Sequence, residues 1–264
     1  MERATARLVW SERRRSRLAA HLFTVAFLAA WWGYSLTVPQ FVLPGPVPVA
    51  IRSWQFFTTY NLYKQAFASL EHIVAAMVVS FAIGSALALA AHYLPVLRLA
   101  VHGRLSPFLN SFSGIGWTLL SIVWFGVNEL TVVFAISVVL TPFAIINMRE
   151  GLETLDRELL EMAASFTRNR WREFVKIVVP GLMPFVFATL RISFGVSWKV
   201  ALAAELFGGR TGLGYLFNVA QQNFDMRLIL VMIAVIIGFV YGTDRLVFLP
   251  LQARFGRPDS EPAS

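Results

Sequence analysis

The sequence predicts an all-α integral membrane protein with six transmembrane helices and a long polar loop on the cytoplasmic side. Three observations support this fold class. Hydrophobic residues make up 57% of the 264 residues and charged residues only 14%, where soluble domains usually carry about 25% charge. Several apolar segments reach the roughly 20 residues that a bilayer requires. Lys and Arg residues gather in alternate connecting segments, as the charge bias of membrane proteins requires.

Six apolar segments of suitable length occur. They are Leu18–Val38, Leu70–Tyr93, Ser111–Val127, Leu130–Met148, Leu182–Leu206 and Leu228–Leu249. A basic segment precedes the first, as in a signal peptide, but the apolar run is too long for one and ends in the bulky Trp31, Trp32 and Tyr34. We therefore expect this first segment to be retained as a helix.

Lys and Arg residues indicate the orientation, because cytoplasmic loops carry an excess of both. With the N-terminus inside, the inner segments carry 17 and the outer segments 4, while Arg191 and Lys199 lie within the fifth span. Both termini are therefore expected in the cytoplasm. This distribution accounts for the net charge of +8 and argues against a nucleic-acid partner, which would need a basic patch or stripe. The inner segments are 1–17, 94–110, 149–181 and the C-terminal end from Arg245 onward.

The same pattern divides the chain into parts. Residues 1–17 form a basic cytoplasmic N-terminus, and residues 18–69 hold the first transmembrane helix and an outer interfacial segment. Residues 70–250 form the core domain, which includes the polar loop 149–181, and residues 251–264 form a cytoplasmic tail. Membrane lipid is therefore an expected partner along most of the chain.

Two local patterns predict packing. A Pro/Gly cluster within residues 39–48 predicts a turn, and the following segment around Trp54 predicts a short helix at the outer interface, where aromatic rings prefer to lie. In the second span, Ser80, Gly84 and Ala88 recur every four residues. Small residues at this spacing let a neighbouring helix approach closely.

The loop between the fourth and fifth spans is charged and amphipathic. Residues 155–165 predict a helix with Asp156 as its N-cap, and residues 169–179 predict a second helix capped by Asn169 and ended by Pro180. Two interpretations are open: a pair of helices lying in the lipid headgroups, or a docking element for a cytoplasmic partner. The apolar face of the second helix is Trp171, Phe174, Val175 and Val178.

Residues 161–180 read E-M-A-x3-T-x9-I-x-V-P. This stretch resembles the cytoplasmic signature loop of permease subunits of bacterial ABC importers, which reads Glu-Ala-Ala, three residues, Gly, nine residues, Ile, one residue, Leu-Pro. Other segments resemble the branch of these permeases that imports nitrate, taurine, aliphatic sulfonates and related small solutes. They are LPGPVPV at 43–49, IVWFGVNE at 122–129 and LRISFGVSWKVALAAELFGGRTGLGY at 190–215.

The resemblance implies a type I ABC importer permease architecture. Two permease subunits, identical or different, would face each other above two cytoplasmic ATPase subunits and receive solute from a periplasmic or lipid-anchored binding protein. The loop would act as a coupling helix that seats in a cleft of the ATPase. This chain lacks the G-x-x-x-x-G-K-[ST] motif, so ATP would bind to the partner subunits. The residues implied in coupling are Glu161, Met162, Ala163, Thr167 and Pro180.

The sequence departs from the family pattern in two places. Thr167 stands where the family has glycine, and a left-handed conformation there would cost a β-branched residue about 1–2 kcal/mol. The helix end is therefore expected to be remodelled, with Asn169 involved, or to continue without a sharp break. The third span also lacks the prolines that are usual in the family. Both departures favour pairing with a different, more typical permease.

Lys199 is the main candidate for the translocation pathway. A lysine inside an apolar span costs about 2.5–3.5 kcal/mol on insertion scales, so it usually faces a cavity or a partner. It would attract an anionic solute such as a sulfonate, taurine or nitrate. The alternatives are an ion pair with Glu205 or a snorkelling side chain, and snorkelling is the expected role of Arg191. Glu205, Ser197 and Trp117 are the other candidate pathway residues.

Other functions find little support. The sequence GGRTGLGY at 208–215 lacks the flanking strand of a phosphate-binding loop and faces outside, so we expect a tight turn before a short outer helix, Leu216–Asn223. The four histidines have no metal-ligand spacing, cysteine is absent, and we expect neither a metal nor a cofactor. A membrane enzyme would need more polar groups within the spans. The remaining alternative is a self-contained secondary transporter or channel, which would need internal repeats or coupling-ion sites.

Overall fold

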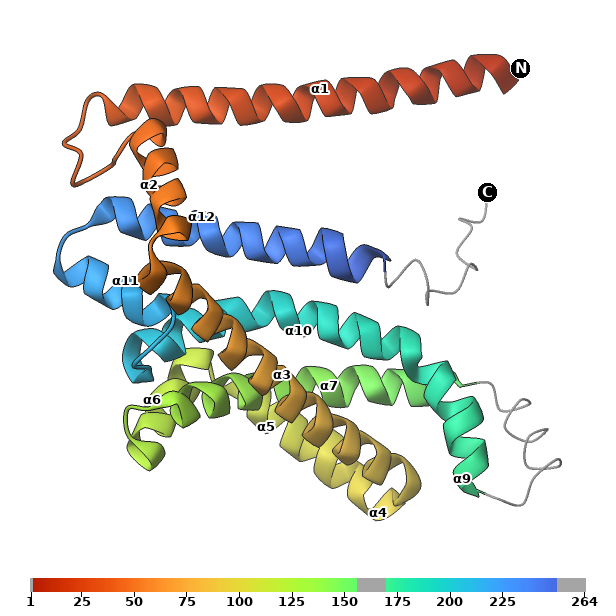
Figure 1. Ribbon diagram of the computed structural model, residues 1–264. Helices are drawn as coiled ribbons and strands as arrows, with labels where there is room; N and C mark the ends of the chain where they lie inside the picture. Colours follow the sequence, from red (N-terminus) through yellow and green to blue (C-terminus); the bar gives the residue numbers. More distant parts are fainter. Residues whose placement is uncertain (1, 156–169, 251–264) are drawn as a thin grey trace.

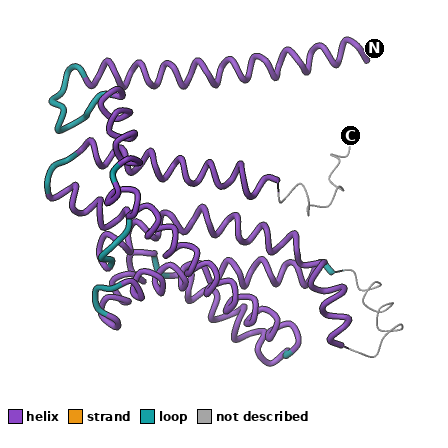
Figure 2. The backbone as a smooth tube through the Cα atoms, viewed as in Figure 1, coloured by secondary structure: helices purple, strands orange, loops and turns teal. Residues whose placement is uncertain are grey.

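Every regular element within residues 2–155 and 170–250, the residues that this computed structural model describes, is helical (Figures 1 and 2). The all-α fold class is therefore confirmed. Three π-helical turns join or extend the α-helices: η1 (Leu99–Leu105) precedes α5, η2 (Phe174–Val178) precedes α10, and η3 (Asp244–Phe248) follows α12. The α-helices are α1 (Glu2–Ser35), α2 (Pro46–Thr58), α3 (Tyr60–Tyr93), α4 (Pro95–Arg98), α5 (Ser106–Ser111), α6 (Gly114–Phe125), α7 (Glu129–Thr154), α9 (Arg170–Glu173), α10 (Val179–Gly208), α11 (Leu213–Gln222) and α12 (Met226–Thr243).

Short polar side chains fix where several helices begin. Ser113, Asn128 and Asp225 cap α6, α7 and α12. Each side-chain oxygen accepts a hydrogen bond from the backbone N–H three residues on, at 3.2, 3.0 and 3.1 Å. These bonds satisfy N–H groups that the first helical turn leaves unpaired. Gly126 ends α6 with a φ of 76°, a backbone region that favours glycine.

Helices α3, α7 and α10 form the centre of the fold, with α7 packed along both of the others. Gly84 of α3 allows the close approach, because a Cβ at Gly84 would lie 2.5 Å from Ala144 Cβ and 2.9 Å from the Thr141 carbonyl oxygen on α7. Ala88, one turn further on, packs against Met148 and Leu152 of α7. The small-residue pattern thus predicted this interface correctly. Fully buried side chains between the helices include Ile73, Val132, Ile136, Leu140 and Ala204.

Four helices in the described part of the chain are long and apolar enough to cross a membrane: Asn61–Tyr93, Glu129–Thr154, Phe174–Gly208 and Met226–Phe248. They correspond to the second, fourth, fifth and sixth predicted spans. A fifth span results if α4–η1–α5 and α6, which meet at 88°, count as one broken span. Most of the first predicted span lies in α1, which ends at Ser35, and residues 36–38 form a turn. Because α1 is not among these helices, the count of six stays a prediction.

The third predicted span, Ser111–Val127, is wrong as a single straight helix. α5 ends at Ser111, and α6 begins at Gly114 in a new direction. The cause is local: Ser113 has an extended backbone, with φ −69° and ψ 157°, and caps the new helix. Residues 94–110, expected to be a cytoplasmic loop, are mostly helical and form the other arm of the bent pair.

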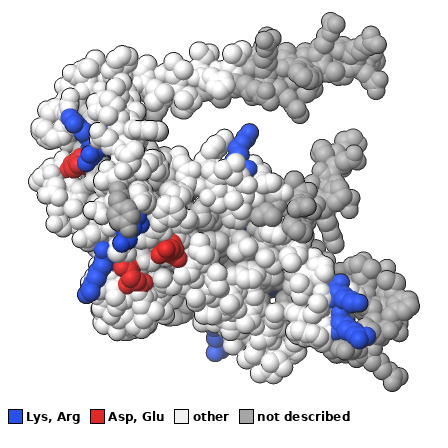
Figure 3. Space-filling model, in the orientation of Figure 1, with Lys and Arg blue, Asp and Glu red and all other residues white. Residues whose placement is uncertain are grey.

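The helix ends fall at two opposite sides of the molecule. The beginning of α1 and the inner ends of α3, α7 and η3 lie on one side, together with α9, while α2, α11 and the turn between α6 and α7 lie on the other (Figure 1). On the face drawn in Figure 3, the surface between these sides is largely uncharged. The two sides match the inner and outer segments that the sequence distinguishes, and we call them inner and outer below.

On the outer side, α2 and α11 confirm the two short helices that the sequence predicts. α2 packs against α12, with Phe56 fully buried and Trp54 75% exposed. α11 begins at Leu213, three residues earlier than predicted. Residues 209–212 therefore connect α10 to α11. We call this connection together with the first two residues of α11 the outer turn (residues 209–214).

Candidate translocation groove and outer turn

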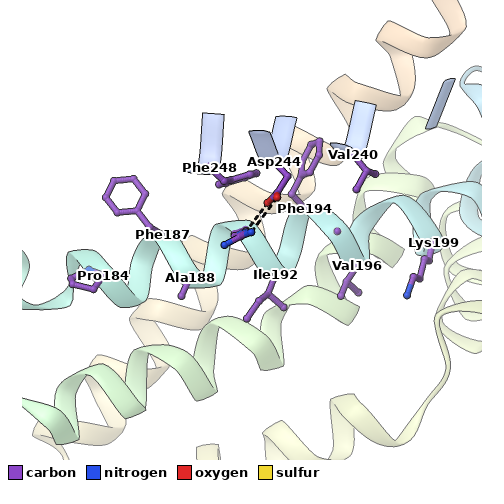
Figure 4. A pocket seen from close by; sticks show the side chains of 12 residues that line it. Pro184, Phe187, Ala188, Ile192, Phe194, Val196, Lys199, Val240, Asp244 and Phe248 are labelled. Carbon is purple, nitrogen blue, oxygen red and sulfur yellow. Dashed lines mark hydrogen bonds and ion pairs between the residues drawn. The ribbon is translucent and has the colours of Figure 1, made fainter. Parts of the chain in front are cut away.

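A groove of about 630 Å³ runs between α10 and the end of α12 with η3 (Figure 4). Apolar side chains form most of its wall, and Lys199 lies at the opposite end of the row from Pro184 (Figure 4). Lys199 is exposed, and no ion pair or hydrogen bond engages its ammonium within the described part of the chain. The groove therefore presents an available cation on an otherwise apolar surface. Its lining is Pro184, Phe187, Ala188, Arg191, Ile192, Phe194, Gly195, Val196, Lys199, Val240, Asp244 and Phe248.

Arg191, the second cation of the groove, is paired. Its Nε donates to Asp244 Oδ1 at 2.7 Å, and its Nη2 donates to Asp244 Oδ2 at 3.1 Å. This two-pronged geometry joins α10 to η3 and fits a guanidinium to a carboxylate. The expectation that Arg191 snorkels to the interface is therefore wrong, since the guanidinium faces another helix of the same chain. The pairing leaves Lys199 as the uncompensated charge of the groove.

Glu205 does not pair with Lys199, so that alternative for the lysine is wrong. The carboxylate of Glu205 is 1% exposed and accepts hydrogen bonds from Ser69 Oγ at 2.7 Å and from the Gly214 N–H at 2.8 Å. Its other oxygen lies 2.9 Å from His72 Nδ1. Helix geometry explains the outcome: six residues turn the chain by about 600°, which places Lys199 and Glu205 on different faces of α10.

The outer turn closes over this carboxylate. Gly212 has a φ of 105°, and an added Cβ would collide with the Glu205 carboxylate. At Gly214 an added Cβ would collide with the Leu202 carbonyl oxygen and lie 2.6 Å from Glu205 Cβ. The glycines of the turn are thus required by close approach to Glu205, which explains the GGRTGLGY sequence without a phosphate ligand.

Three further contacts tie the outer turn to α3 and α7. The Gly212 N–H donates to Gln65 Oε1, and the Leu213 N–H donates to Ser69 Oγ, both at 2.7 Å. Thr211 Oγ1 donates to Glu129 Oε1 at 2.8 Å. The ends of three membrane-crossing helices therefore meet at one turn of the backbone.

His72 and Glu129 also belong to this arrangement, although sequence reasoning did not identify them as site residues. His72 Nε2 lies 2.5 Å from Glu129 Oε2, so the imidazole stands between two carboxylates, one from α10 and one from α7. Metal-ligand spacing, the usual sequence signal of a functional histidine, does not reveal this arrangement. The signal that could have found the site is a histidine and a glutamate, each within an apolar span, together with a glycine-rich turn directly after the glutamate.

Trp117 and Ser197, also predicted in the pathway, are buried in the packing of the described chain. Trp117 Nε1 donates to the Leu109 carbonyl oxygen at 3.1 Å, which fastens α6 to α5 across their bend. Ser197 Oγ donates to the Phe194 carbonyl oxygen of its own helix at 2.7 Å. Neither side chain lines the groove that contains Lys199.

Four of the five predicted coupling residues, Glu161, Met162, Ala163 and Thr167, lie outside the described residues. Pro180 is described and is exposed. The expectation that Pro180 ends a helix is wrong, because the chain stays helical from Arg170 through η2 into α10. Pro180 is the second residue of α10 and directly follows the π-helical turn η2. Proline and a π-helical turn both change the hydrogen-bond pattern locally within a continuous helical stretch.

The segment just after the predicted coupling residues is packed against the inner ends of the core helices. Val178 and Leu182 join Ala88, Met148 and Leu152 in one buried cluster. Of the apolar face predicted for this segment, Val178 is buried, whereas Trp171 is 70% and Val175 is 44% exposed. A displacement of this segment would therefore act directly on α3, α7 and α10.

Comparison with known proteins identifies the family of the chain. A family model described as "Binding-protein-dependent transport system inner membrane component" matches residues 80–249, more than half of the chain. The chain is 27% identical over 237 residues to a probable ABC transporter permease protein of Brucella melitensis biotype 1, covering 89% of this chain and 95% of that protein. It is 26% identical over 242 residues to the taurine transport system permease protein TauC of Escherichia coli K12, covering 87% and 86%.

The fold is similar to that of a solved membrane transporter. A chain of the MetNI methionine ABC transporter, in an inward-facing conformation, aligns with a TM-score of 0.63 at 12% identity. The alignment covers 75% of this chain and 98% of that chain. At this identity the likeness concerns the arrangement of helices.

Proposed function

The chain belongs to the family of binding-protein-dependent transport system inner membrane components, and we propose that it lines the path of a small anionic solute through a bacterial inner membrane. It is an ABC importer permease subunit, of the branch related to nitrate, sulfonate and taurine permeases. The family is one of transport subunits. A second permease subunit, identical or different, completes the path, two ATPase subunits supply energy from the cytoplasm, and a periplasmic or lipid-anchored binding protein delivers the solute.

The choice of an anionic solute rests on one observation, the unpaired ammonium of Lys199 in the groove of α10. Arg191 and Asp244 neutralise each other across the groove, whereas Lys199 has no such partner in the described chain. A cation on an apolar surface is stabilised when an anion approaches, and the anion is in turn drawn to it. A sulfonate, the sulfonate end of taurine, or nitrate would meet this requirement.

Coupling to the ATPase is assigned to residues 156–180. The resemblance of this loop to the family signature supports the assignment, and so does the packing of its described end. Because Val178 and Leu182 share a buried cluster with Met148 and Leu152, a push on the loop is transmitted to α7 and α10 through side chains already in contact. Rigid helices then carry the displacement toward Lys199.

We assign both termini to the cytoplasm and count α1 as a sixth span, with the bent pair as one span. The distribution of Lys and Arg supports this orientation. Exposed apolar side chains along α1, such as Phe23, Val25 and Phe27, suit a helix surrounded by lipid. Because the chain has no cysteine, single cysteines can be labelled without background. Thr211→Cys is expected to react with an impermeant maleimide from outside, and Arg254→Cys only after the cells are opened; the reverse pattern would overturn the orientation.

The solute assignment is tested by uptake in proteoliposomes that contain the permeases, the ATPase, the binding protein and ATP. Taurine, an alkanesulfonate and nitrate are the probes. Lys199→Met is expected to lower uptake about tenfold or more, a loss of about 1.4 kcal/mol, at an unchanged protein level. Lys199→Arg should keep part of the activity, because the charge is retained while the shape differs. Arg104→Met, which removes an exposed charge from η1, is the matched control. Normal uptake by well-inserted Lys199→Met would refute the role of Lys199.

A further inference from the structure

Two carboxylates from different helices flank the imidazole of His72. Nδ1 lies 2.9 Å from Glu205 Oε1, and Nε2 lies 2.5 Å from Glu129 Oε2. Glu205 is 1% exposed, and Glu129 Oε2 is shielded from solvent with no partner other than the imidazole among the described residues. Each ring nitrogen therefore faces an oxygen that, when ionised, can only accept a hydrogen bond.

A neutral imidazole between two ionised carboxylates has one proton too few for this geometry. A neutral imidazole has a single N–H, and its other nitrogen bears a lone pair. That nitrogen would then face a carboxylate lone pair, and such a repulsion is strong where the facing atoms are shielded from water, as Glu129 Oε2 is although its side chain is otherwise 46% exposed. With the further proton, both ring nitrogens donate, and the three groups carry a net charge of −1. Without it they carry −2, and one of the two contacts becomes repulsive.

The three side chains also hold the outer turn. Glu205 accepts from the Gly214 N–H and Glu129 accepts from Thr211 Oγ1. Ser69, which donates to Glu205, accepts from the Leu213 N–H. If His72 separates from either carboxylate, the hydrogen bonds that position the turn lose one of their supports.

We propose that His72, Glu205 and Glu129 are positioning residues that, by sharing one proton, hold the outer turn against the outer ends of α3 and α7. Loss of this proton as pH rises releases the turn. Glu205 from α10 and Glu129 from α7 are the charged groups that face His72 in the described chain. From α3 and the turn, the neighbours are the uncharged Gln65, Ser69, Thr211 and backbone N–H groups. The role in transport rests on the proposed function, whereas the release of the turn does not.

The absence of cysteine allows a direct measurement of the turn. Leu213 is fully buried at the start of α11, so Leu213→Cys should react with an impermeant maleimide only when the turn lifts. Tyr215→Cys, at an exposed position two residues on, corrects for the faster reaction of thiols at high pH. Between about pH 6 and about pH 9, the labelling rate of Leu213→Cys divided by that of Tyr215→Cys is expected to rise about tenfold or more. A constant ratio over this range would overturn the proposal.

We call the proton-dependent contact of His72 with Glu205 and Glu129 the clamp. The Glu129→Gln variant distinguishes this clamp from ordinary packing. The amide that this substitution introduces can donate to Nε2 of a neutral imidazole, while Nδ1–H still donates to Glu205. Added to Leu213→Cys, it should therefore keep the relative labelling rate low at every pH. His72→Gln, which leaves one carboxylate without its partner, should give a high rate that does not respond to pH. A rise with pH as large as that of the parent, in the presence of Glu129→Gln, would contradict the shared proton.

Uptake of taurine, measured in the same proteoliposomes, distinguishes the release of the turn from the role of the turn in transport. If the clamp positions the turn for transport, wild-type uptake should fall over the pH range in which the labelling of Leu213→Cys rises. In Glu129→Gln, uptake should no longer fall over this range. If labelling responds to pH but taurine, an alkanesulfonate and nitrate are not taken up at any pH, the clamp is supported and the proposed solutes are refuted. Normal uptake over the whole range, despite a lifted turn, would refute the positioning role.

Discussion

The backbone N–H of Gly214 donates to the carboxylate of Glu205, nine residues earlier in the chain. This bond brings the outer turn so close to α10 that no side chain fits at position 214. Gly214→Ala is therefore expected to displace the turn and to destabilise the protein by about 1–3 kcal/mol, as overpacking typically does. The fall in unfolding temperature in detergent measures this effect.

Gly195, in α10, supplies the control. An added Cβ there meets nothing within 4 Å, so Gly195→Ala should be neutral or stabilise α10 by up to about 1 kcal/mol. Equal unfolding temperatures for the two variants would mean that the turn is not tightly packed on Glu205.

Gly84 is expected to be the least replaceable residue of α3. A Cβ at this position would lie 2.5 Å from Ala144 Cβ and 2.9 Å from the Thr141 carbonyl oxygen, and backbone atoms cannot move aside as the end of a side chain can. Gly84→Val should force α3 and α7 apart and lower both protein level and unfolding temperature. Gly238→Ala in α12, where space is open, should change neither. A stable Gly84→Val variant would contradict the helix packing described above.

The Arg191–Asp244 pair is expected to show coupling in a double-mutant cycle. Its side chains are 38% and 37% exposed, so an exposed-pair interaction of about 0.2–1 kcal/mol is the appropriate expectation. Arg191→Met and Asp244→Asn should each reduce thermal stability, and the double variant should lose less than the sum. Strictly additive losses would show that the pair contributes nothing measurable between α10 and η3.

The sequence was most informative where local composition decides the structure. Long apolar runs predicted α3, α7, α10 and α12, and the spacing of Gly84 and Ala88 predicted the face that α3 turns toward α7. Hydropathy failed at Ser113, because a capping serine that redirects the chain hardly changes an average over about 20 residues. It also could not show that residues 94–110 continue as a helix, since their charges mark them as a loop.

The candidate site depended on contacts that no local pattern contains. His72 and Glu205 are separated by 133 positions in the chain, and only the packing of α3 on α10 brings them together. Lys199 and Glu205 are near in sequence, but the helix turns them to different faces. The cost of a lysine in an apolar span can be judged from sequence alone, which singles out Lys199. Its role in the pathway stays a prediction.

Dependence on ATP tests the central claim, that this chain is the permease of an ATP-driven importer coupled through residues 156–180. The measurement is solute uptake into proteoliposomes with the complete complex, with and without ATP, for the wild type and for Glu161→Lys. We expect ATP to drive accumulation by the wild type, and Glu161→Lys to abolish it and the association with the ATPase, while the protein still inserts in the membrane. Uptake by the chain without ATPase subunits, or undiminished ATP-driven uptake by Glu161→Lys, would contradict the account.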